Sequence, residues 1–319
     1  MRTNVLSGNG DDGIEISGDA RGVTVNKAII GLNTNGLVLL PNGDNGVEIG
    51  GNAHHNVIGG FDPSVIPQNT ISGNMNHGVA IIGDARDNQV FNNFIGTDLL
   101  GLQMDVGFGN GGAGVFLGDN TQHNTIGGKG AEDRNLISGN VGHGVELTGA
   151  THHNKIIANL IGSDRLGIAL PGFGNQGAGV FLDNGTHHNT ITANTASGNG
   201  SAGFFLQGSN HNRLTGNSAV ENTGDGFRLE DSNFNTLKSN TAKNNDGDGF
   251  HVENSNDNKF IKNSAEENDG LGFFVDELFA NMFKKNQCAL NVLGGSNLLG
   301  ICLAILGGWR SSYLLDTVG

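Results

Sequence analysis

Two consecutive stretches of the chain decide its fold. Residues 226–248 read GFRLEDSNFNTLKSNTAKNNDGD, and residues 249–271 read GFHVENSNDNKFIKNSAEENDGL. Both begin with Gly-Phe and carry asparagine at three equivalent positions, so the repeating unit is 23 residues long. A repeat of this length is typical of solenoid proteins. The equivalent positions from residue 203 onward are Gly203, Gly226, Gly249 and Gly272; Asn212, Asn235, Asn258 and Asn281; Asn217, Asn240, Asn263 and Asn286; and Asn222, Asn245, Asn268 and Asn291.

Each unit contains three short stretches in which apolar and polar residues alternate, G-[VF]-x-[LIV], N-x-[LF] and N-x-[AC]. Such alternation is the period of a β-strand, and the glycine, asparagine and aspartate between the stretches are turn residues. One coil of three strands cannot bury its apolar side alone, so successive coils must stack and pair their strands in parallel. We therefore predict an all-β chain, a single-stranded right-handed parallel β-helix of about ten coils with three short strands per coil.

Stacking places equivalent residues of successive coils above one another. We expect the asparagines of each series to hydrogen-bond from coil to coil as a ladder. The second and fourth residues of the first strand should point inward. An internal aromatic column is therefore predicted at Phe204, Phe227, Phe250 and Phe273.

The same first strand recurs upstream at a longer spacing, with its glycine at Gly13, Gly46, Gly78, Gly114, Gly144 and Gly179. We interpret residues 1–297 as one β-helix, with loops inserted into the coils of 1–202 and strict coils over 203–297. Residues 298–319 are apolar and are interpreted as a C-terminal cap that covers the open strand edges. Because the repeat begins almost at Met1, we expect either that the chain is part of a longer one or that a leader segment is absent from it.

Composition excludes two classes of partner. The chain has 17 basic and 31 acidic residues, a formal net charge of −14, and it shows no basic cluster. A nucleic-acid binder needs clustered Lys and Arg to displace counterions, so we expect no nucleic-acid partner. No apolar run reaches about 18 residues, so we expect no membrane span.

The runs N-x-I-S-G-N-x-x-x-G-V-x-I, N-x-I-G-T-D and N-x-I-G-G resemble those of right-handed parallel β-helix proteins of the pectate-lyase-like superfamily. The chain is most similar to the NosD-like and the carbohydrate-binding and sugar-hydrolysis repeats of bacterial secreted and surface proteins, over about residues 4 to 297. The resemblance implies a secreted or cell-surface location and contact with polysaccharide. It supplies no catalytic motif, because the same coils serve lyases, hydrolases, epimerases and adhesins.

The outward residues of the first strand form the candidate binding face. Four of them, in consecutive coils, are Phe116, Glu146, Phe181 and Phe205. Exposed phenylalanines on a sheet indicate either a ligand or partner that covers them or cover by the chain's own loops. The loops that end near Phe108 and Phe173 could provide that cover. The whole row is Glu15, Glu48, Ala80, Phe116, Glu146, Phe181, Phe205, Arg228, His251 and Phe274.

Asp98, Asp105 and Asp164 lie in or beside the long loops and are the candidate catalytic residues. Acid/base chemistry on a glycosidic bond needs two carboxyl groups about 5 to 9.5 Å apart, which stacked coils can supply. The simpler interpretation is that these aspartates close turns. Calcium ligation by the same loop oxygens is a further alternative, although the fold itself requires no cofactor.

A column of histidines precedes the first asparagine series, at His55, His123, His153, His188 and His211. Stacked imidazoles can converge on a metal, but we favour a repeated turn residue and predict no metal site there.

Cys288 and Cys302 are a candidate disulfide, which would stabilise the folded chain by about 3 kcal/mol if it is unstrained. The alternative is a pair of buried free thiols.

These observations favour an extracytoplasmic module that binds polysaccharide or a surface protein without catalysis. The only tryptophan and tyrosine, Trp309 and Tyr313, lie in the tail, and basic residues are few. A lyase for acidic polysaccharide needs aromatic platforms and basic residues in its groove, so this composition argues against one. A polysaccharide-active lyase, hydrolase or epimerase is the alternative, and an architectural spacer is the second alternative.

Overall fold

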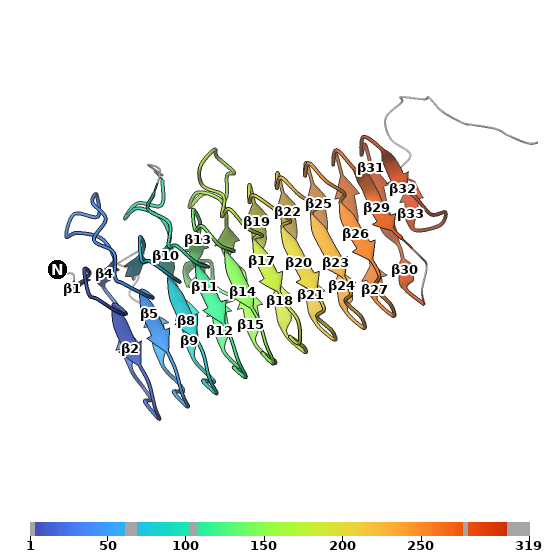
Figure 1. Ribbon diagram of the computed structural model, residues 1–319. Coiled ribbons are helices and arrows are strands. Elements are labelled where there is room, and N and C mark those ends of the chain that lie inside the picture. Colours follow the sequence, from blue (N-terminus) through green and yellow to red (C-terminus); the bar gives the residue numbers. More distant parts are fainter. Residues whose placement is uncertain (1–3, 61–68, 103–106, 277–279, 305–319) are drawn as a thin grey trace, which may run out of the picture.

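The computed structural model describes residues 4–60, 69–102, 107–276 and 280–304. Within these residues the chain forms 33 short strands and one 3₁₀ turn, η1 (Ala131–Asp133). The strands stack into three parallel sheets, and Figure 1 shows the resulting elongated solenoid. The predicted fold class, a parallel β-helix of about ten coils, is confirmed.

The chain visits the three sheets in turn. Sheet 1 comprises β2 (Ile14–Ile16), β5 (Val47–Ile49), β8 (Val79–Ile81), β11 (Val115–Leu117), β14 (Val145–Leu147), β17 (Val180–Leu182), β20 (Phe204–Gln207), β23 (Phe227–Glu230), β26 (Phe250–Glu253), β29 (Leu271–Val275) and β32 (Gly294–Ser296). Sheet 2 comprises β3 (Thr24–Val25), β6 (Val57–Gly59), β9 (Gln89–Phe91), β12 (Thr125–Gly127), β15 (Lys155–Ile157), β18 (Thr190–Thr192), β21 (Arg213–Thr215), β24 (Thr236–Lys238), β27 (Lys259–Ile261) and β30 (Met282–Lys284). Sheet 3 comprises β1 (Asn4–Leu6), β4 (Ala28–Ile30), β7 (Asn69–Ile71), β10 (Asn93–Ile95), β13 (Leu136–Ile137), β16 (Leu160–Ile161), β19 (Thr195–Ser197), β22 (Ser218–Val220), β25 (Thr241–Lys243), β28 (Ser264–Glu266), β31 (Asn286–Ala289) and β33 (Cys302–Ala304).

The core runs along the solenoid axis between the three sheets. Phe204, Phe227, Phe250 and Phe273 are fully buried within it. Their rings stack with centroids 4.8, 4.8 and 4.5 Å apart and planes within 10° of parallel. The predicted internal aromatic column is therefore confirmed.

Asparagine ladders run along the turns, and the coil-to-coil hydrogen bonding predicted for them is confirmed. The Oδ1 atom of Asn235 accepts the backbone N–H of Asn212, at 2.8 Å, and its Nδ2 atom donates to the carbonyl oxygen of Ser209, also at 2.8 Å. One side chain thus satisfies two backbone groups that have no strand partner. The first ladder continues upstream through Asn189, Asn154, Asn124, Asn88 and Asn56.

A glycine opens each strand of sheet 1 because the coils approach closely there. A Cβ atom at Gly226 would lie 2.5 Å from the Cβ of Ala242 and 2.6 Å from the carbonyl oxygen of Gly249. Any larger residue would therefore push the coils apart, and the coil stacking requires glycine at this position.

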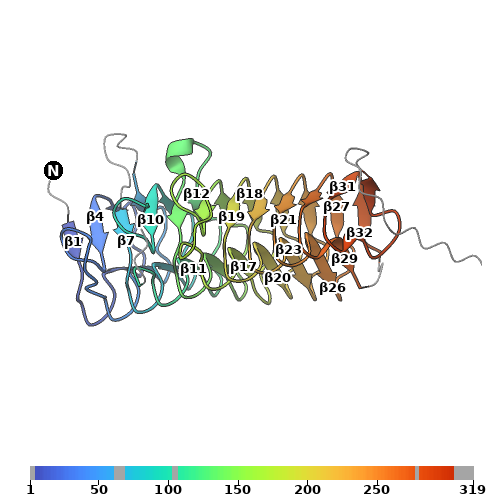
Figure 2. The same cartoon turned by 90° about the horizontal axis from the view of Figure 1, so that it is seen from above.

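The irregular segments lie at the turns and at the C-terminal end. Figure 2 shows the loop that carries η1 standing out from the solenoid. At the C-terminal end Ile301 is buried against the core, and Cys288 and Cys302, the predicted pair, are joined by a disulfide. The predicted cap beyond residue 304 lies outside the described residues. Across the described ranges, no helix is both long enough and apolar enough to cross a membrane.

We expect the substitution Phe227→Ala to lower the free energy of unfolding by about 3 to 5 kcal/mol, because it leaves a cavity in the stacked column. Chemical denaturation monitored by circular dichroism measures this loss. Phe234→Ala is the matched control, because Phe234 is 52% exposed on a turn, and it should change the value by less than about 0.5 kcal/mol. Equal effects of the two substitutions would contradict the core assignment.

We expect Asn235→Ala to cost about 1 to 3 kcal/mol, because the backbone N–H of Asn212 and the carbonyl of Ser209 lose their buried partner. Thermal unfolding of the variant beside Asn184→Ala, a change in an exposed turn, tests this. A thermally neutral Asn235→Ala would mean that the ladder is not a source of stability.

Candidate functional site

The outward residues of sheet 1 form one continuous row. Phe116, Glu146, Phe181 and Phe205 occupy paired positions on consecutive strands from β11 to β20. The row continues through Arg228, His251 and Phe274 on β23, β26 and β29. All seven side chains are half-buried. The four residues proposed for a binding face therefore lie side by side on one surface.

Two phenylalanines of this row are covered by histidines of the preceding coil. The His77 ring stacks on Phe116, and the His143 ring stacks on Phe181, each with centroids 4.4 Å apart. The loop residues Phe108 and Phe173 make no such ring contact within the described chain. Cover by the chain itself therefore comes from a regular position of the coil, next to the glycine that opens sheet 1, and not from the inserted loops.

These histidines are held in one tautomer. The Nδ1 atom of His77 accepts the backbone N–H of Ala113, and that of His143 accepts the N–H of Ala178, both at 2.9 Å. Burial lowers the pKa of both imidazoles, opposed by the charge of Asp44 near His77 and of Asp183 near His143. Each histidine therefore covers one face of its phenylalanine ring, and no sugar can stack on that face.

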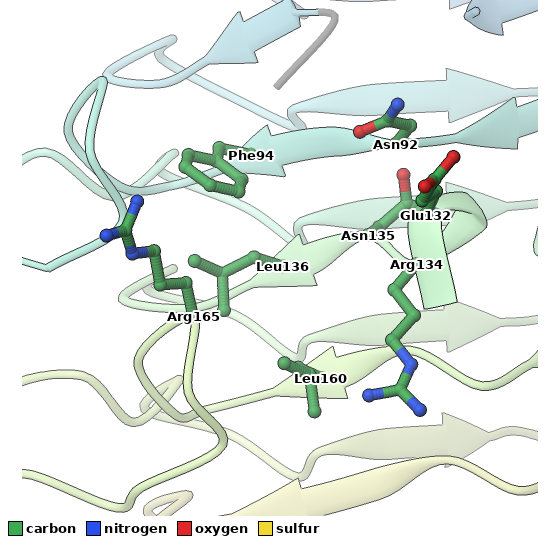
Figure 3. Close-up of a pocket in the computed structure, with 8 residues that line it drawn as sticks. All are labelled: Asn92, Phe94, Glu132, Arg134, Asn135, Leu136, Leu160 and Arg165. Atoms are coloured by element: carbon green, nitrogen blue, oxygen red, sulfur yellow. The ribbon is translucent and has the colours of Figure 1, made fainter. Parts of the chain in front are cut away.

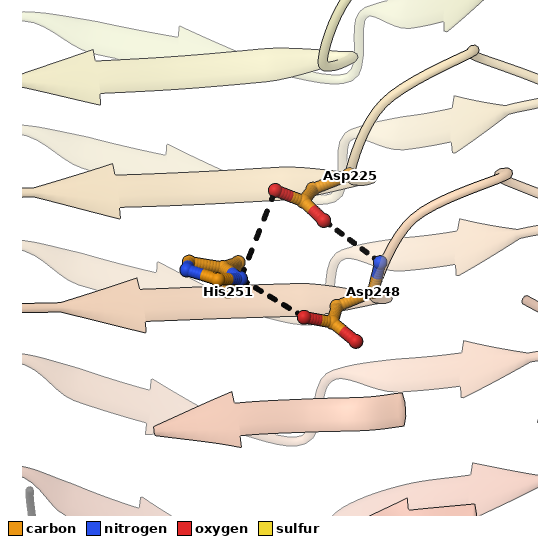
Figure 4. A group of neighbouring side chains, drawn as sticks. All are labelled: Asp225, Asp248 and His251. Carbon is orange, nitrogen blue, oxygen red and sulfur yellow. Dashed lines mark hydrogen bonds and ion pairs between the residues drawn. The ribbon is translucent and has the colours of Figure 1, made fainter. Parts of the chain in front are cut away.

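A cluster of charged side chains lies farther along the same face. Figure 4 shows Asp225, Asp248 and His251, which come from two successive coils. The Nδ1 atom of His251 lies 2.9 Å from an Oδ2 oxygen of Asp248 and 3.9 Å from Oδ2 of Asp225. Each aspartate uses its other oxygen to accept a backbone N–H, from Asp248 and from Leu271, at 2.7 Å. Both carboxylates are therefore fixed in place.

Arg228 lies beside this cluster and connects three carboxylates. Its guanidinium is 3.3 Å from Asp225, 3.4 Å from Glu230 and 3.3 Å from Glu253. It also lies over the ring of Phe205, 5.6 Å from the centroid, within the range of a cation–π contact. The aromatic part of the row is thus continuous with the charged part.

Burial and charge shift the pKa values of the groups on this face. Burial alone would lower the pKa of His251, but its hydrogen bond to Asp248 and the charge of Asp225 raise it. Burial raises the pKa of Asp225, against the opposing effects of the Asp248 N–H, His251 and Arg228. Burial and the charge of Asp183 raise the pKa of Glu146. An imidazole whose pKa is raised and a guanidinium are therefore surrounded by carboxylates.

A shallow hollow of about 340 Å³ adjoins the cluster. It is lined by Phe205, Gln207, Asp225, Arg228 and Glu230, with small residues of the neighbouring turns. Glu230 is about a third exposed, and so is Arg228. The hollow therefore offers hydrogen-bond donors and acceptors that a solvent-borne ligand can reach.

Among the described residues, two groups of side chains bring three metal-ligating atoms within 4.8 Å of one another, namely Asp225, Asp248 and His251, and Asp11, Asp12 and Asp44. In the first group the guanidinium of Arg228 lies 3.3 Å from Asp225, and this positive charge opposes a bound cation. The second group consists of carboxylates alone near the N-terminal end. Neither group includes the loop aspartates for which calcium ligation was considered.

The candidate catalytic aspartates occupy turns. The Oδ1 atom of Asp98 accepts the backbone N–H groups of Leu100 and Leu102, and that of Asp164 accepts those of Leu166 and Ile168. Both carboxylates are buried. Asp105 lies outside the described residues. The geometry of Asp98 and Asp164 is that of turn closure, which is the simpler of the two interpretations of these residues.

A second pocket, of about 250 Å³, lies over the outer face of sheet 3 (Figure 3). Phe94, Leu136 and Leu160 form its apolar floor, and Arg134 and Arg165 flank it. Both arginines are exposed, so this pocket is more positive than the hollow on sheet 1. Arg134 directly follows η1, so an inserted loop builds one wall.

The sequence interpretation missed the residue that precedes the opening glycine of each sheet 1 strand. His77, His143, Asp225 and Asp248 all occupy this position. The sequence did contain a signal for these residues, because their position lies beside the outward row in every coil and repeatedly carries an ionisable residue.

The sequence was compared with family models and with curated protein sequences. Residues 168–298 match the family model described as periplasmic copper-binding protein (NosD). No curated protein sequence matches the chain.

Two solved structures are among those that match the chain. The periplasmic alginate epimerase AlgG is 15% identical with a TM-score of 0.56, and the match covers 88% of this chain and 66% of that protein. The A-module of the mannuronan C-5 epimerase AlgE4 from Azotobacter vinelandii is 12% identical with a TM-score of 0.49, over 95% of this chain and 88% of that one. The chain thus spans about two thirds of the length of AlgG, and likeness at this identity concerns the fold alone. The three stacked parallel sheets give the chain the fold of right-handed parallel β-helix proteins, and residues 168–298 are similar to the NosD family.

Proposed function

We propose that the outer face of sheet 1 binds a neutral polysaccharide without catalysis, in a secreted or cell-surface setting. The observation that carries this proposal is the hollow beside Phe205 and Arg228, which adjoins an uninterrupted outward row on seven strands. A linear ligand that follows the axis would meet equivalent positions at the coil spacing of about 4.8 Å.

The charge of the face favours a neutral ligand. Arg228 and His251 are surrounded by four carboxylates, those of Asp225, Asp248, Glu230 and Glu253. The whole chain carries a formal net charge of −14. An acidic polysaccharide would therefore be repelled, whereas sugar hydroxyl groups can donate to the partly exposed carboxylates of Glu230 and Glu253 and accept from the guanidinium.

The hydrogen bonds of the cluster favour binding over catalysis. Both oxygens of Asp225 and of Asp248 are already engaged, and the Nε2 atom of His251 lies 3.5 Å from Glu253. A general base needs a free lone pair within reach of the proton it removes. An enzyme of the same superfamily is the second candidate, and it is favoured by the likeness of fold to AlgG, which is an alginate epimerase.

Two observations support a location outside the cytoplasm. The disulfide between Cys288 and Cys302 is a bond that persists in oxidising compartments. The matched family and the AlgG structure are both described as periplasmic. A surface protein remains the alternative partner for the same face.

The matched family is also described as copper-binding, so the side chains of this chain that could bind copper are of interest. Imidazole nitrogen is a favoured ligand of Cu²⁺, whereas carboxylates suit harder cations. The cluster on sheet 1 offers one imidazole and has Arg228 beside it, so its donor set does not fit copper. Pairs of imidazoles with a fitting donor set lie on a turn between sheets 1 and 2.

Affinity electrophoresis in gels that contain galactomannan, xyloglucan or mixed-linkage β-glucan tests the binding proposal, with alginate and polygalacturonate as acidic comparisons. We expect at least one neutral polysaccharide to retard the protein, and the combined change Arg228→Gln and Glu230→Gln to weaken this retardation at least tenfold. Lys238→Gln is the matched control, because it lies in the same coil on sheet 2.

Equal retardation of the variant and the control would contradict the location of the site. Each polysaccharide should also be incubated with the protein, with and without Ca²⁺, and its products separated. Shortened, unsaturated or epimerised products would favour the enzyme over the binding module.

A further inference from the structure

Eight histidines lie on the turn between sheet 1 and sheet 2, immediately before the first asparagine ladder. They are His54, His55, His123, His152, His153, His187, His188 and His211. In three coils two of them are adjacent in sequence, and the second of each pair is exposed. Coil stacking therefore concentrates imidazoles on one outer turn, away from the sheet 1 face.

The paired imidazoles are in direct contact. The two Nδ1 atoms are 2.8 Å apart in His54 and His55, 2.8 Å apart in His152 and His153, and 2.9 Å apart in His187 and His188. The rings of each pair are nearly perpendicular. One proton lies between the two nitrogens, so each Nδ1 atom has the other imidazole of its pair as its partner.

Two of the pairs stack on each other. His152 stacks on His187 with ring centroids 5.1 Å apart, and His153 stacks on His188 at 5.3 Å. His123 and His211 extend the second column by one coil in each direction. We call these six residues the histidine block.

The turn itself does not require histidine. The second position of each pair has a positive φ, near 55°, and Asp87 and Phe234 adopt the same conformation in equivalent turns. The first position is occupied by Arg86 and Gln122 in neighbouring coils, paired in the same bridge pattern. Because residues as different as arginine, glutamine, aspartate and phenylalanine fill these positions in other coils, turn formation alone does not account for paired imidazoles.

Two imidazoles of the block resist protonation. Partial burial and the neighbouring histidines lower the pKa of His152 and of His188. Neutral imidazole is the form that binds metal ions.

The spacing of the nitrogens fits a particular class of ion. Two nitrogens in adjacent positions of a square-planar ion, each bound at about 2.0 Å, lie about 2.8 Å apart, whereas a tetrahedral ion separates them by about 3.3 Å. The observed 2.8 and 2.9 Å are the distances of an N–H···N hydrogen bond, and the same separation suits two adjacent positions of a square-planar ion. Square-planar nitrogen coordination is typical of Cu²⁺ and Ni²⁺, and Cu²⁺ binds more tightly.

We propose that the paired histidines chelate Cu²⁺, and more weakly Ni²⁺, through their two Nδ1 atoms. The donor ring changes tautomer, so that its proton leaves Nδ1 and a proton is taken up at its Nε2 atom; both rings stay neutral, both Nδ1 lone pairs bind the ion, and water fills the remaining positions. The histidine block holds one ion tightly, because a second dication one coil away would be repelled, and the pair of His54 and His55 forms a separate site. This site is independent of polysaccharide binding on sheet 1.

The test uses the full chain, expressed without a histidine tag, stripped with chelator and kept free of reductant. Equilibrium dialysis against CuCl₂, NiCl₂, ZnCl₂ and CaCl₂ measures uptake, and electron paramagnetic resonance detects nitrogen coupling to bound Cu²⁺. We expect about two tight Cu²⁺ ions per chain, weaker Ni²⁺ and still weaker Zn²⁺, with no comparable Ca²⁺ uptake.

The block variant combines His152→Gln, His153→Asn, His187→Gln and His188→Asn, with asparagine chosen where φ is positive. It should lose about half of the tightly bound Cu²⁺, and the further changes His54→Gln and His55→Asn should remove nearly all of the rest. Unchanged circular dichroism and melting temperature establish that the variants fold.

A gain of binding provides the second arm. In the block variant, which lacks the neighbouring pairs, Gln122→His places a new imidazole beside His123 and should restore about one tightly bound Cu²⁺, whereas the matched control Gln122→Asn should restore none. Full Cu²⁺ uptake by the variant that lacks all three native pairs would overturn the proposal, and so would absence of tight Cu²⁺ uptake by the unaltered chain.

Discussion

The asparagine ladders are the interaction on which the rest of this structure depends. At each turn the chain leaves a sheet, so backbone N–H and C=O groups lose their strand partners inside the protein. Asn240 shows the solution: its Oδ1 atom accepts the N–H of Asn217, and its Nδ2 atom donates to the carbonyl of Leu214 and to the next asparagine, Asn263. Because each such asparagine bonds to the coils on both sides, the turns cannot shift independently, and the register of all three sheets follows from them.

Because the register is fixed, equivalent positions of successive coils form columns of side chains, and these columns have different roles. Inside, the column at Phe227 contributes stacked rings to the core. Outside, the same strand presents Arg228, whose partners come from its own coil and from the next one. Functional sites on such a scaffold are therefore built from neighbouring coils, and each substitution acts mainly through the coils directly above and below it.

The parts of the structure that repeat could be predicted from the sequence, and the parts that do not repeat could not. The buried phenylalanines and ladder asparagines recur at one spacing, so their stacking follows from the period alone. The covering of Phe181 by His143 could not be predicted in this way, because histidine occupies that position in only some coils. Phe173 belongs to an inserted loop, and periodicity carries no information about where such a loop packs. The cluster around His251 was missed because Asp225 joins it only through contact between coils.

The stacking that stabilises the solenoid also decides what its surfaces can bind. When rings stack along the axis, as His77 and Phe116 do, each ring covers a face of the other and the ring edges are left for solvent. This geometry weakens the case for aromatic sugar platforms on sheet 1 and shifts the binding role to the polar groups of the hollow, Gln207, Arg228 and Glu230. On the histidine turn the same stacking has the opposite consequence, because an imidazole binds a metal through a nitrogen at its ring edge and not through its face. Stacked imidazoles such as His153 and His188 therefore keep their ligating atoms accessible while their faces stabilise the turn. One packing rule thus disfavours face-on recognition of sugars and favours edge-on coordination of a metal ion.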